Sequence, residues 1–283
     1  MFTSRYCSAI CLTMLSFVLA IALAVPAIAQ DGPVTLRFSP PAGEVLKYHM
    51  SSSRAMNFSG MDLTFISGHD VEMTLEETLT DTAGATTSRV ALTWTKSTST
   101  MMRSGDLQEW EDPVKPQGRT VKVIVTPRGE VEEVIGSILG IPKGRPLEQY
   151  VDVWFIHLPE DAVQKGSTWT VDLDESEGEG DEASSTKGSI VYELKKLGEK
   201  KGIRVAEVEG KGTVDIVRAG PPYFEGKAEV KIKAAIAVDG GYIVEMSHTV
   251  DTKGKMISQD PATGKEQEHD FAQSESIEIK LEK

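Results

Sequence analysis

AEVKIKAAIAV (residues 228–238) alternates apolar side chains with the charged residues Glu229, Lys231 and Lys233. Because successive side chains of a β-strand point to opposite faces, this period of two predicts a strand with one buried face and one face in water. Strands of this kind are typical of antiparallel sheets, whereas the strands of parallel sheets are apolar on both faces.

The same alternation recurs along most of the chain. It is present in the runs 34–38, 71–75, 90–94, 121–125 and 277–281. Segments rich in glycine, proline and aspartate separate such runs at 81–84, 127–129, 199–202 and 239–241, as tight hairpins require. The sequence therefore predicts a mostly β protein of roughly a dozen strands. We expect a large curved antiparallel sheet or an open barrel or sandwich.

One segment follows a helical period instead. Apolar residues recur at spacings of three and four, bounded by Pro146 and Pro159, at Leu147, Tyr150, Val151, Trp154, Phe155 and Leu158. This pattern predicts one α-helix that covers the sheet. An alternative is a lid over an apolar cavity, in which the aromatic side chains contact a ligand.

The N-terminal residues 1–29 are typical of a secretory signal peptide. They combine the basic Arg5, the apolar run Leu15–Leu23 and the small-residue exit Ala27-Ile28-Ala29. Both cysteines of the chain, Cys7 and Cys11, lie in this segment. We therefore expect an exported protein, periplasmic or extracellular, whose mature chain has no cysteine, no disulfide and no transmembrane segment.

The remaining residues, 30–283, are predicted to form a single antiparallel β domain. Two parts, 31–140 and 158–283, share a similar order of strands and turns, and Arg89-Val90-Ala91 aligns with Arg204-Val205-Ala206. Internal duplication of a meander is one interpretation, and chance similarity among alternating strands is the other.

The stretch Pro159–Trp169 fits the pattern P-x-x-x-V-x-x-G-x-x-W, with Val163 and Gly166 at its inner fixed positions. It resembles a passage of bacterial exported proteins that are classed only as a domain of unknown function. An early strand similar to Gly43–Tyr48 and a hairpin similar to Pro127–Val131 extend the resemblance. It implies a secreted β-rich protein of the cell envelope and implies no activity.

Composition and motifs limit the possible chemistry. The formal net charge of −13 at pH 7 argues against nucleic acid as a partner. No zinc-hydrolase, nucleophile-elbow or phosphate-loop motif occurs, so no catalytic residue, metal or cofactor is predicted. The acidic stretch 172–182 lacks the spacing of a calcium loop. It and the polar stretch 259–269 are predicted to be loops. Spatially paired carboxylates of a glycosidase stay open as a less supported alternative.

The functional hypothesis is therefore a non-enzymatic envelope protein that binds an apolar ligand or a lipid-bearing partner. The candidate ligand-binding residues are Trp154, Phe155 and Tyr150 on the predicted helix. His248 is added because it shares the inward parity of Tyr242, Val244, Met246 and Val250. A structural or protein-interaction module of the envelope is the alternative, and a hydrolase is less supported. The oligomeric state stays open.

Overall fold

A computed structural model describes residues 32–58, 61–80, 82, 84–103, 106–108, 114–141, 147–177, 183–220, 223–259 and 265–282. The predicted signal peptide, residues 1–29, lies outside the described residues. Contacts divide the chain into Met1–Gly32 and Pro33–Lys283. All that follows concerns the second of these units.

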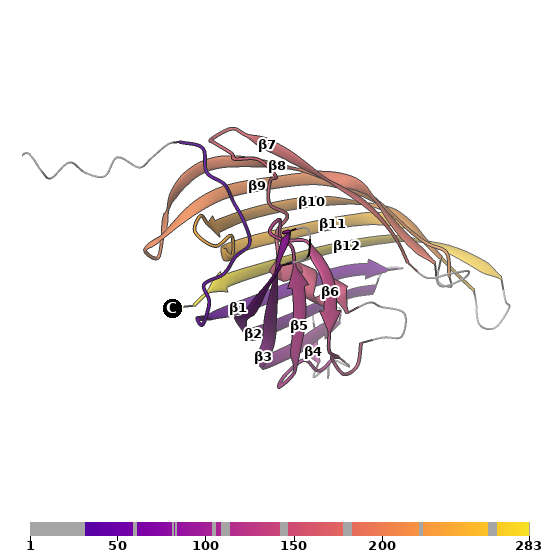
Figure 1. The fold of residues 1–283 in the computed structure, drawn as a ribbon. Coiled ribbons are helices and arrows are strands. Elements are labelled where there is room, and N and C mark those ends of the chain that lie inside the picture. The colour runs from indigo at the N-terminus through magenta and orange to yellow at the C-terminus, as the bar shows by residue number, and fades with distance from the viewer. Residues whose placement is uncertain are drawn as a thin grey trace, which may run out of the picture. The chain divides into compact units, whose positions relative to one another are not determined.

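The unit Pro33–Lys283 is built on long antiparallel strands (Figure 1). The strands are β1 (Val45–Phe58), β2 (Met61–Thr80), β3 (Thr86–Arg103), β4 (Asp106–Gln108), β5 (Thr120–Val125), β6 (Val131–Ile135), β7 (Thr168–Glu177), β8 (Ser184–Lys200), β9 (Ile203–Arg218), β10 (Tyr223–Ala237), β11 (Ile243–Gln259) and β12 (Glu266–Leu281).

One sheet contains all of these strands in the order β6-β5-β3-β2-β1-β12-β11-β10-β9-β8-β7, and β4 pairs with β3 beside this path. The only step in this path between strands distant in the sequence joins β1 to β12. The predicted antiparallel, mostly β class is confirmed. The sheet is open, with β6 and β7 at its two ends, so it does not close into a barrel.

The covering α-helix is not confirmed. The described part of the segment forms one α-helical turn, α2 (Glu148–Val151), and one 3-10 turn, η1 (Asp152–Trp154). From Phe155 the backbone is extended, with φ −125° and ψ 156°. Two causes account for this. Trp154, Phe155 and Ile156 are all buried, which one face of a helix does not allow, and Pro159 disfavours helical backbone before it.

Two stretches predicted to be loops, 172–182 and 259–269, belong in part to strands, and their residues 178–182 and 260–264 lie outside the described residues. Residues 172–177 belong to β7, where Glu175 pairs with Thr186 of β8. Residues 266–269 belong to β12, and Gln259 is the last residue of β11. Charged side chains that suggested loops occupy strand positions, since one face of each strand is open to water.

Two extended segments cover one end of the sheet. The N-terminal segment, Val34–Pro40, exchanges backbone hydrogen bonds with Val163 and donates to the carbonyl oxygens of Pro127 and Gly240. The cover segment, residues 147–163, donates from the Leu158 amide to the Arg128 carbonyl oxygen at 2.7 Å. We call the sheet face that these segments contact the inner face and the opposite face the outer face.

The hydrophobic core lies between the inner face and these segments. Trp154 packs edge to face on Tyr48 of β1, with ring centroids 5.8 Å apart. Phe155 packs in the same way on Phe38 of the N-terminal segment, at 5.3 Å. These contacts fix the cover segment on the sheet although it contains little helix.

Candidate ligand-binding face

The inner face continues along the strands beyond the cover segment. Inward-facing residues of neighbouring strands pair directly across β8, β9, β10, β11, β12, β1, β2 and β3 and form transverse rows. We call the three rows farther along the strands the distal rows. In that order of strands they are Tyr192, Gly210, Ile232, His248, Ile277, Ser52, Ser67 and Ser99; Ile190, Gly212, Val230, Val250, Glu275, Arg54, Phe65 and Met101; and Gly188, Val214, Ala228, Thr252, Gln273, Met56, Leu63 and Arg103.

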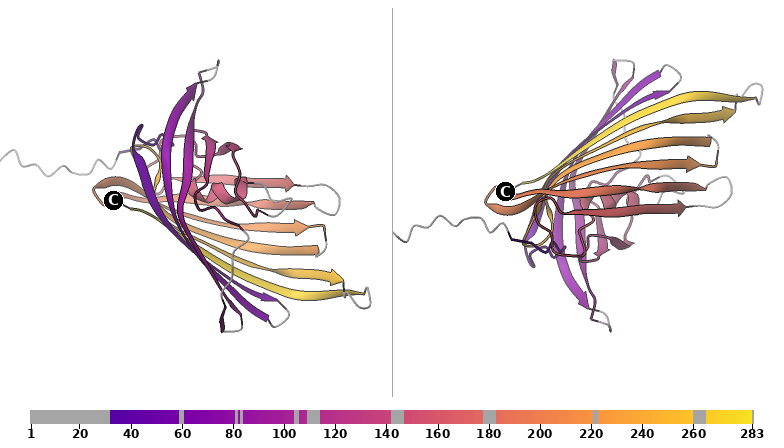
Figure 2. Two further views of the ribbon diagram at one scale, coloured as in Figure 1. Left: turned by 90° about the horizontal axis from the view of Figure 1, so that it is seen from below. Right: turned by 90° about the horizontal axis from the view of Figure 1, so that it is seen from above.

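Most of these side chains are apolar or small. The side chains on β8, β9 and β10 are mostly buried, whereas Leu63 on β2 and Met101 on β3 are only half-buried. The buried members of these rows are Ile190, Tyr192, Val214, Ala228, Val230, Ile232 and Thr252. Among the described residues, extensive contacts between elements join sheet neighbours, and otherwise only α2 with η1 and with β6. The cover segment reaches the first of these rows, because the His157 carbonyl oxygen accepts a hydrogen bond from Trp169, whose ring stacks on Tyr192. Figure 2 shows β10–β12 running on beyond the helical turns.

Glycine shapes the part of this face that lies on β9. A Cβ atom at Gly210 would lie 2.7 Å from Cε1 of Tyr192, so the ring of Tyr192 lies directly over this glycine. Tyr192 also stacks on Trp169, with ring centroids 5.4 Å apart and ring planes 11° from parallel. Burial raises the pKa of the Tyr192 phenol to about 12, so it stays neutral.

A group of polar residues interrupts the apolar surface on β1, β2, β11 and β12. An Nη atom of Arg54 donates to a carboxylate oxygen of Glu275 at 2.8 Å. Next to them the hydroxyl oxygens of Ser52 and Ser67 lie 2.8 Å apart in a hydrogen bond. His248 lies in the row of Ser52. We call these five residues the polar cluster.

Two nitrogen atoms of the polar cluster are buried without a hydrogen-bond partner among the described residues: Nε of Arg54 and Nε2 of His248. Burial lowers the pKa of His248 below its ordinary value of 6.5, and the carboxylate of Glu275 offsets part of this effect. The imidazole is therefore neutral at neutral pH. Unpaired buried polar atoms are costly, which makes these two nitrogens candidates for contact with a ligand.

The structure places the sequence-predicted residues in two different settings. Trp154 and Phe155 are buried in the core, at 2% and 7% exposure, and Tyr150 is half-buried against it. His248 lies on the distal rows instead. Sequence reasoning missed Arg54 and Glu275, which are 221 positions apart in the chain. Parity was the available signal for both: Arg54 shares the inward parity of Tyr48, and Glu275 that of Ile277.

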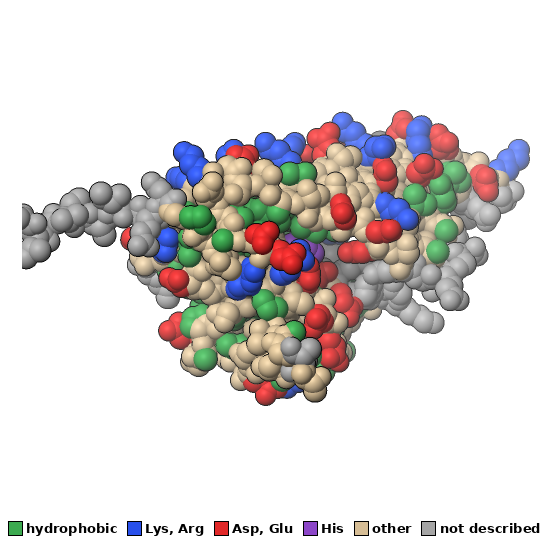
Figure 3. Space-filling view, turned by 45° about the horizontal axis from the view of Figure 1, so that its top comes forward, with side chains coloured by type: hydrophobic (Ala, Val, Ile, Leu, Met, Phe, Trp, Pro, Cys, Tyr) green, Lys and Arg blue, Asp and Glu red, His purple; other side chains and the backbone are tan. Residues whose placement is uncertain are grey.

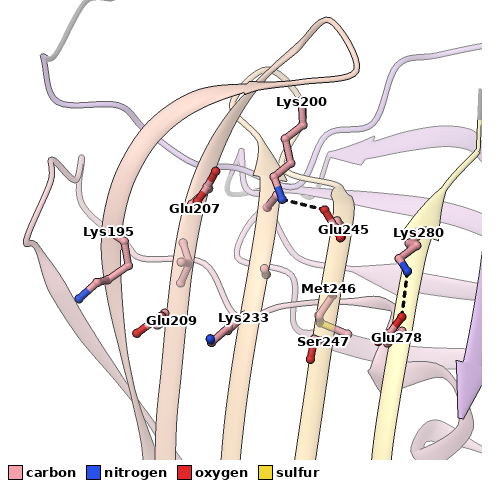
Figure 4. A pocket seen from close by; sticks show the side chains of 13 residues that line it. Lys195, Lys200, Glu207, Glu209, Lys233, Glu245, Met246, Ser247, Glu278 and Lys280 are labelled. Carbon is pink, nitrogen blue, oxygen red and sulfur yellow. Dashed lines mark hydrogen bonds and ion pairs between the residues drawn. The ribbon is translucent and has the colours of Figure 1, made fainter.

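The outer face carries charge in balanced pairs. A shallow hollow of about 380 Å³ crosses β8–β12, and Figure 4 shows Lys200 pointing to Glu245 and Lys280 pointing to Glu278 within it. Their nitrogen-to-oxygen distances are 2.7 and 2.9 Å. Figure 3 shows acidic and basic side chains interspersed over the side of the molecule that it displays. Such pairing is typical of the wet face of a sheet.

A second hollow of the outer face, about 680 Å³, extends from β9 to β2 and is lined mostly by polar and charged residues. Elsewhere on this face Nδ1 of His49 lies 2.7 Å from a carboxylate oxygen of Asp70 on the neighbouring strand. The sequence analysis did not identify this exposed pair. In the described parts of the chain, no three His, Cys, Asp or Glu side chains form a group suited to a metal ion.

No helix among the described residues is long and apolar enough to cross a membrane. No family model matches the sequence, and no curated protein matches it. Among solved structures, the chain is similar to one described as "lipid-protein interactions in lipovitellin", with 12% identity and a TM-score of 0.50. The match covers 86% of this chain and 25% of that chain, so the present chain spans about a quarter of its length. At this identity the likeness concerns the fold alone.

Proposed function

We propose that this chain is an exported, non-enzymatic protein that binds an apolar, lipid-like ligand on the distal rows of its inner face. The observation that carries the proposal is that the apolar side chains of the distal rows on β11, β12, β1, β2 and β3 are only half-buried. Met56 on β1 and Met101 on β3 belong to this surface, which adjoins the buried apolar residues of β8–β10. Apolar surface of this kind gains free energy when a ligand removes it from water.

The similarity to lipovitellin supports the same proposal. That structure is described by its interactions with lipid, and its likeness to this chain concerns a large part of the sheet unit. A broad one-layered sheet presents a wide apolar face, which suits a ligand with long hydrocarbon chains. Trp154, Phe155 and Tyr150 then hold the cover segment in place, and His248 lies on the binding face.

Binding of Nile red, an uncharged dye that fluoresces in apolar surroundings, tests this proposal. We expect the mature protein to bind the dye, and we expect Met101→Gln to weaken binding because it puts an amide into the apolar face. Met102→Gln is the matched control, because Met102 is the next residue of β3 and faces outward.

A second matched pair lies on β2. Phe65→Ser should weaken dye binding, whereas Ile66→Ser should not, since Ile66 is 43% exposed on the outer face. Thermal unfolding of each variant shows whether the fold is kept. Absence of dye binding by the unmodified protein, or equal loss in the inner and outer variants, would contradict the proposal.

A further inference from the structure

We infer that the polar cluster is a headgroup site, and that the ligand carries an uncharged headgroup with oxygen acceptors, such as the hydroxyl and ester groups of a neutral glycerolipid. This inference rests on the proposed function and adds the class of ligand to it. It follows from the charge of the polar cluster, from its unused donors and from its place within an apolar surface.

Unused hydrogen-bond donors lie on both sides of Glu275. Nε of Arg54 always carries a proton and has no partner. The two hydroxyls of Ser52 and Ser67 share one hydrogen bond, so one of them keeps a proton for another acceptor. Nε2 of His248, also without a partner, donates or accepts depending on the tautomer. Oxygen atoms of a ligand would satisfy these groups.

The charge of the cluster favours a neutral headgroup. The guanidinium of Arg54 is neutralised by Glu275 at 2.8 Å, and the carboxylate is mostly shielded from water, at 20% side-chain exposure. An anionic headgroup would face that carboxylate, and a cationic one would face the guanidinium of Arg54, whose side chain is 39% exposed. His248 brings no charge, because burial lowers its pKa.

The apolar neighbours of the ion pair orient the ligand. Val250 and Phe65 flank Glu275 and Arg54 in the same row, and Val230 continues the row on β10. A hydrocarbon chain that starts at the polar cluster can therefore lie along this row. The arrangement of one polar group within an apolar surface matches an amphipathic molecule with one headgroup.

Displacement of Nile red by three ligands with the same hydrocarbon chain tests the inference: monododecanoylglycerol, dodecyl phosphate and dodecane. We expect monododecanoylglycerol to displace the dye at a concentration about tenfold lower than either of the others, as hydrogen bonds to the charged pair would give. Ser52→Ala should weaken the binding of monododecanoylglycerol by about threefold to tenfold. Ser53→Ala is its control, because Ser53 is exposed on the outer face.

A charge variant gives a second, opposite expectation. Glu275→Gln keeps the shape of the side chain but leaves Arg54 without its counter-charge. The affinity for dodecyl phosphate should therefore rise about tenfold. Glu278→Gln, on the outer face of β12, should leave the affinities for all three ligands unchanged. Stronger binding of dodecyl phosphate than of monododecanoylglycerol by the unmodified protein would overturn the inference, as would equal binding of all three. These results, and failure of all three ligands to displace the bound dye, leave the proposed function standing, whereas absence of dye binding by the unmodified protein would overturn the proposed function itself.

Discussion

Glycine at position 212 is a residue on which the shape of the inner face depends. A Cβ atom there would overlap the carbonyl oxygen of Ser189 and lie 3.0 Å from Cα of Ile190, on the neighbouring strand β8. Gly212→Ala should therefore destabilise the protein by about 1–3 kcal/mol, as overpacking does. Urea unfolding measures the loss. Gly198→Ala is the control, because its nearest neighbour is an oxygen of Glu207 at 4.0 Å, and it should leave stability unchanged or slightly raised.

Two half-buried histidines, His157 and His248, predict how stability depends on pH. Burial lowers the pKa of His248 and of His157 below 6.5; Glu275 opposes this at His248, and Glu130 and Glu175 oppose it at His157, where Arg128 adds to the lowering. In this range the unfolded chain binds more protons than the folded one. Stability is therefore complete above pH 6.5 and falls as the pH drops toward the lower folded values.

Urea unfolding between about pH 7.5 and pH 5.5 checks this prediction, with a limiting slope of about 1.4 kcal/mol per pH unit for each proton. His248→Gln should flatten the slope. Two carboxylates also have a lowered pKa, Glu245 beside Lys200 and Asp270 beside Lys255. They affect stability only below this pH range, because their ordinary pKa values are 4.5 and 3.8. Stability that does not change with pH across the range would contradict the burial of these histidines.

Parity in the sequence predicted which way single residues face, but not which residues meet. The inward position of His248 followed from Tyr242, Val244 and Met246. The pairing of Arg54 with Glu275 depends on β1 lying beside β12, the one neighbour pair of the sheet order that joins the two ends of the chain. Local alternation contains no information on such a long-range pairing, and so the polar cluster was not predicted.

At the scale of elements, the cover segment shows where a periodic pattern is insufficient. The apolar spacing from Leu147 to Leu158 fits a helix, yet only seven residues, Glu148–Trp154, form helical turns. Hydrogen bonds from the extended part to Arg128 and Val34, and the contact of Phe155 with Phe38, replace helical bonds. Tertiary contacts with segments distant in the sequence therefore outweigh local propensity here.

Trp154 tests whether the cover segment is core or lid. Trp154 is 2% exposed and its ring contacts Tyr48. Trp154→Ala should therefore lower the free energy of unfolding by about 3–5 kcal/mol. Tyr150→Ala, at a half-buried position, should cost less. Chemical unfolding measures both. A Trp154→Ala variant of full stability that no longer binds Nile red would instead favour the lid interpretation.

At the scale of the whole sheet, alternation and turn residues were sufficient for its class, since each strand has one apolar and one charged face. The open ends at β6 and β7 were not predictable, because closure depends on the twist and curvature of the sheet and not on the pattern of one strand. The same alternation explains the binding face. The strands keep their apolar parity beyond the residues that the cover segment buries.

Native mass spectrometry of the mature protein, purified without detergent from its own source, tests binding of an apolar ligand most directly. We predict an added mass on the folded protein that is lost on denaturation and that is recovered in an organic extract as a neutral glycerolipid. A folded protein that carries no added mass, and that gains none after incubation with the lipid extract of the same source, would contradict the proposed function.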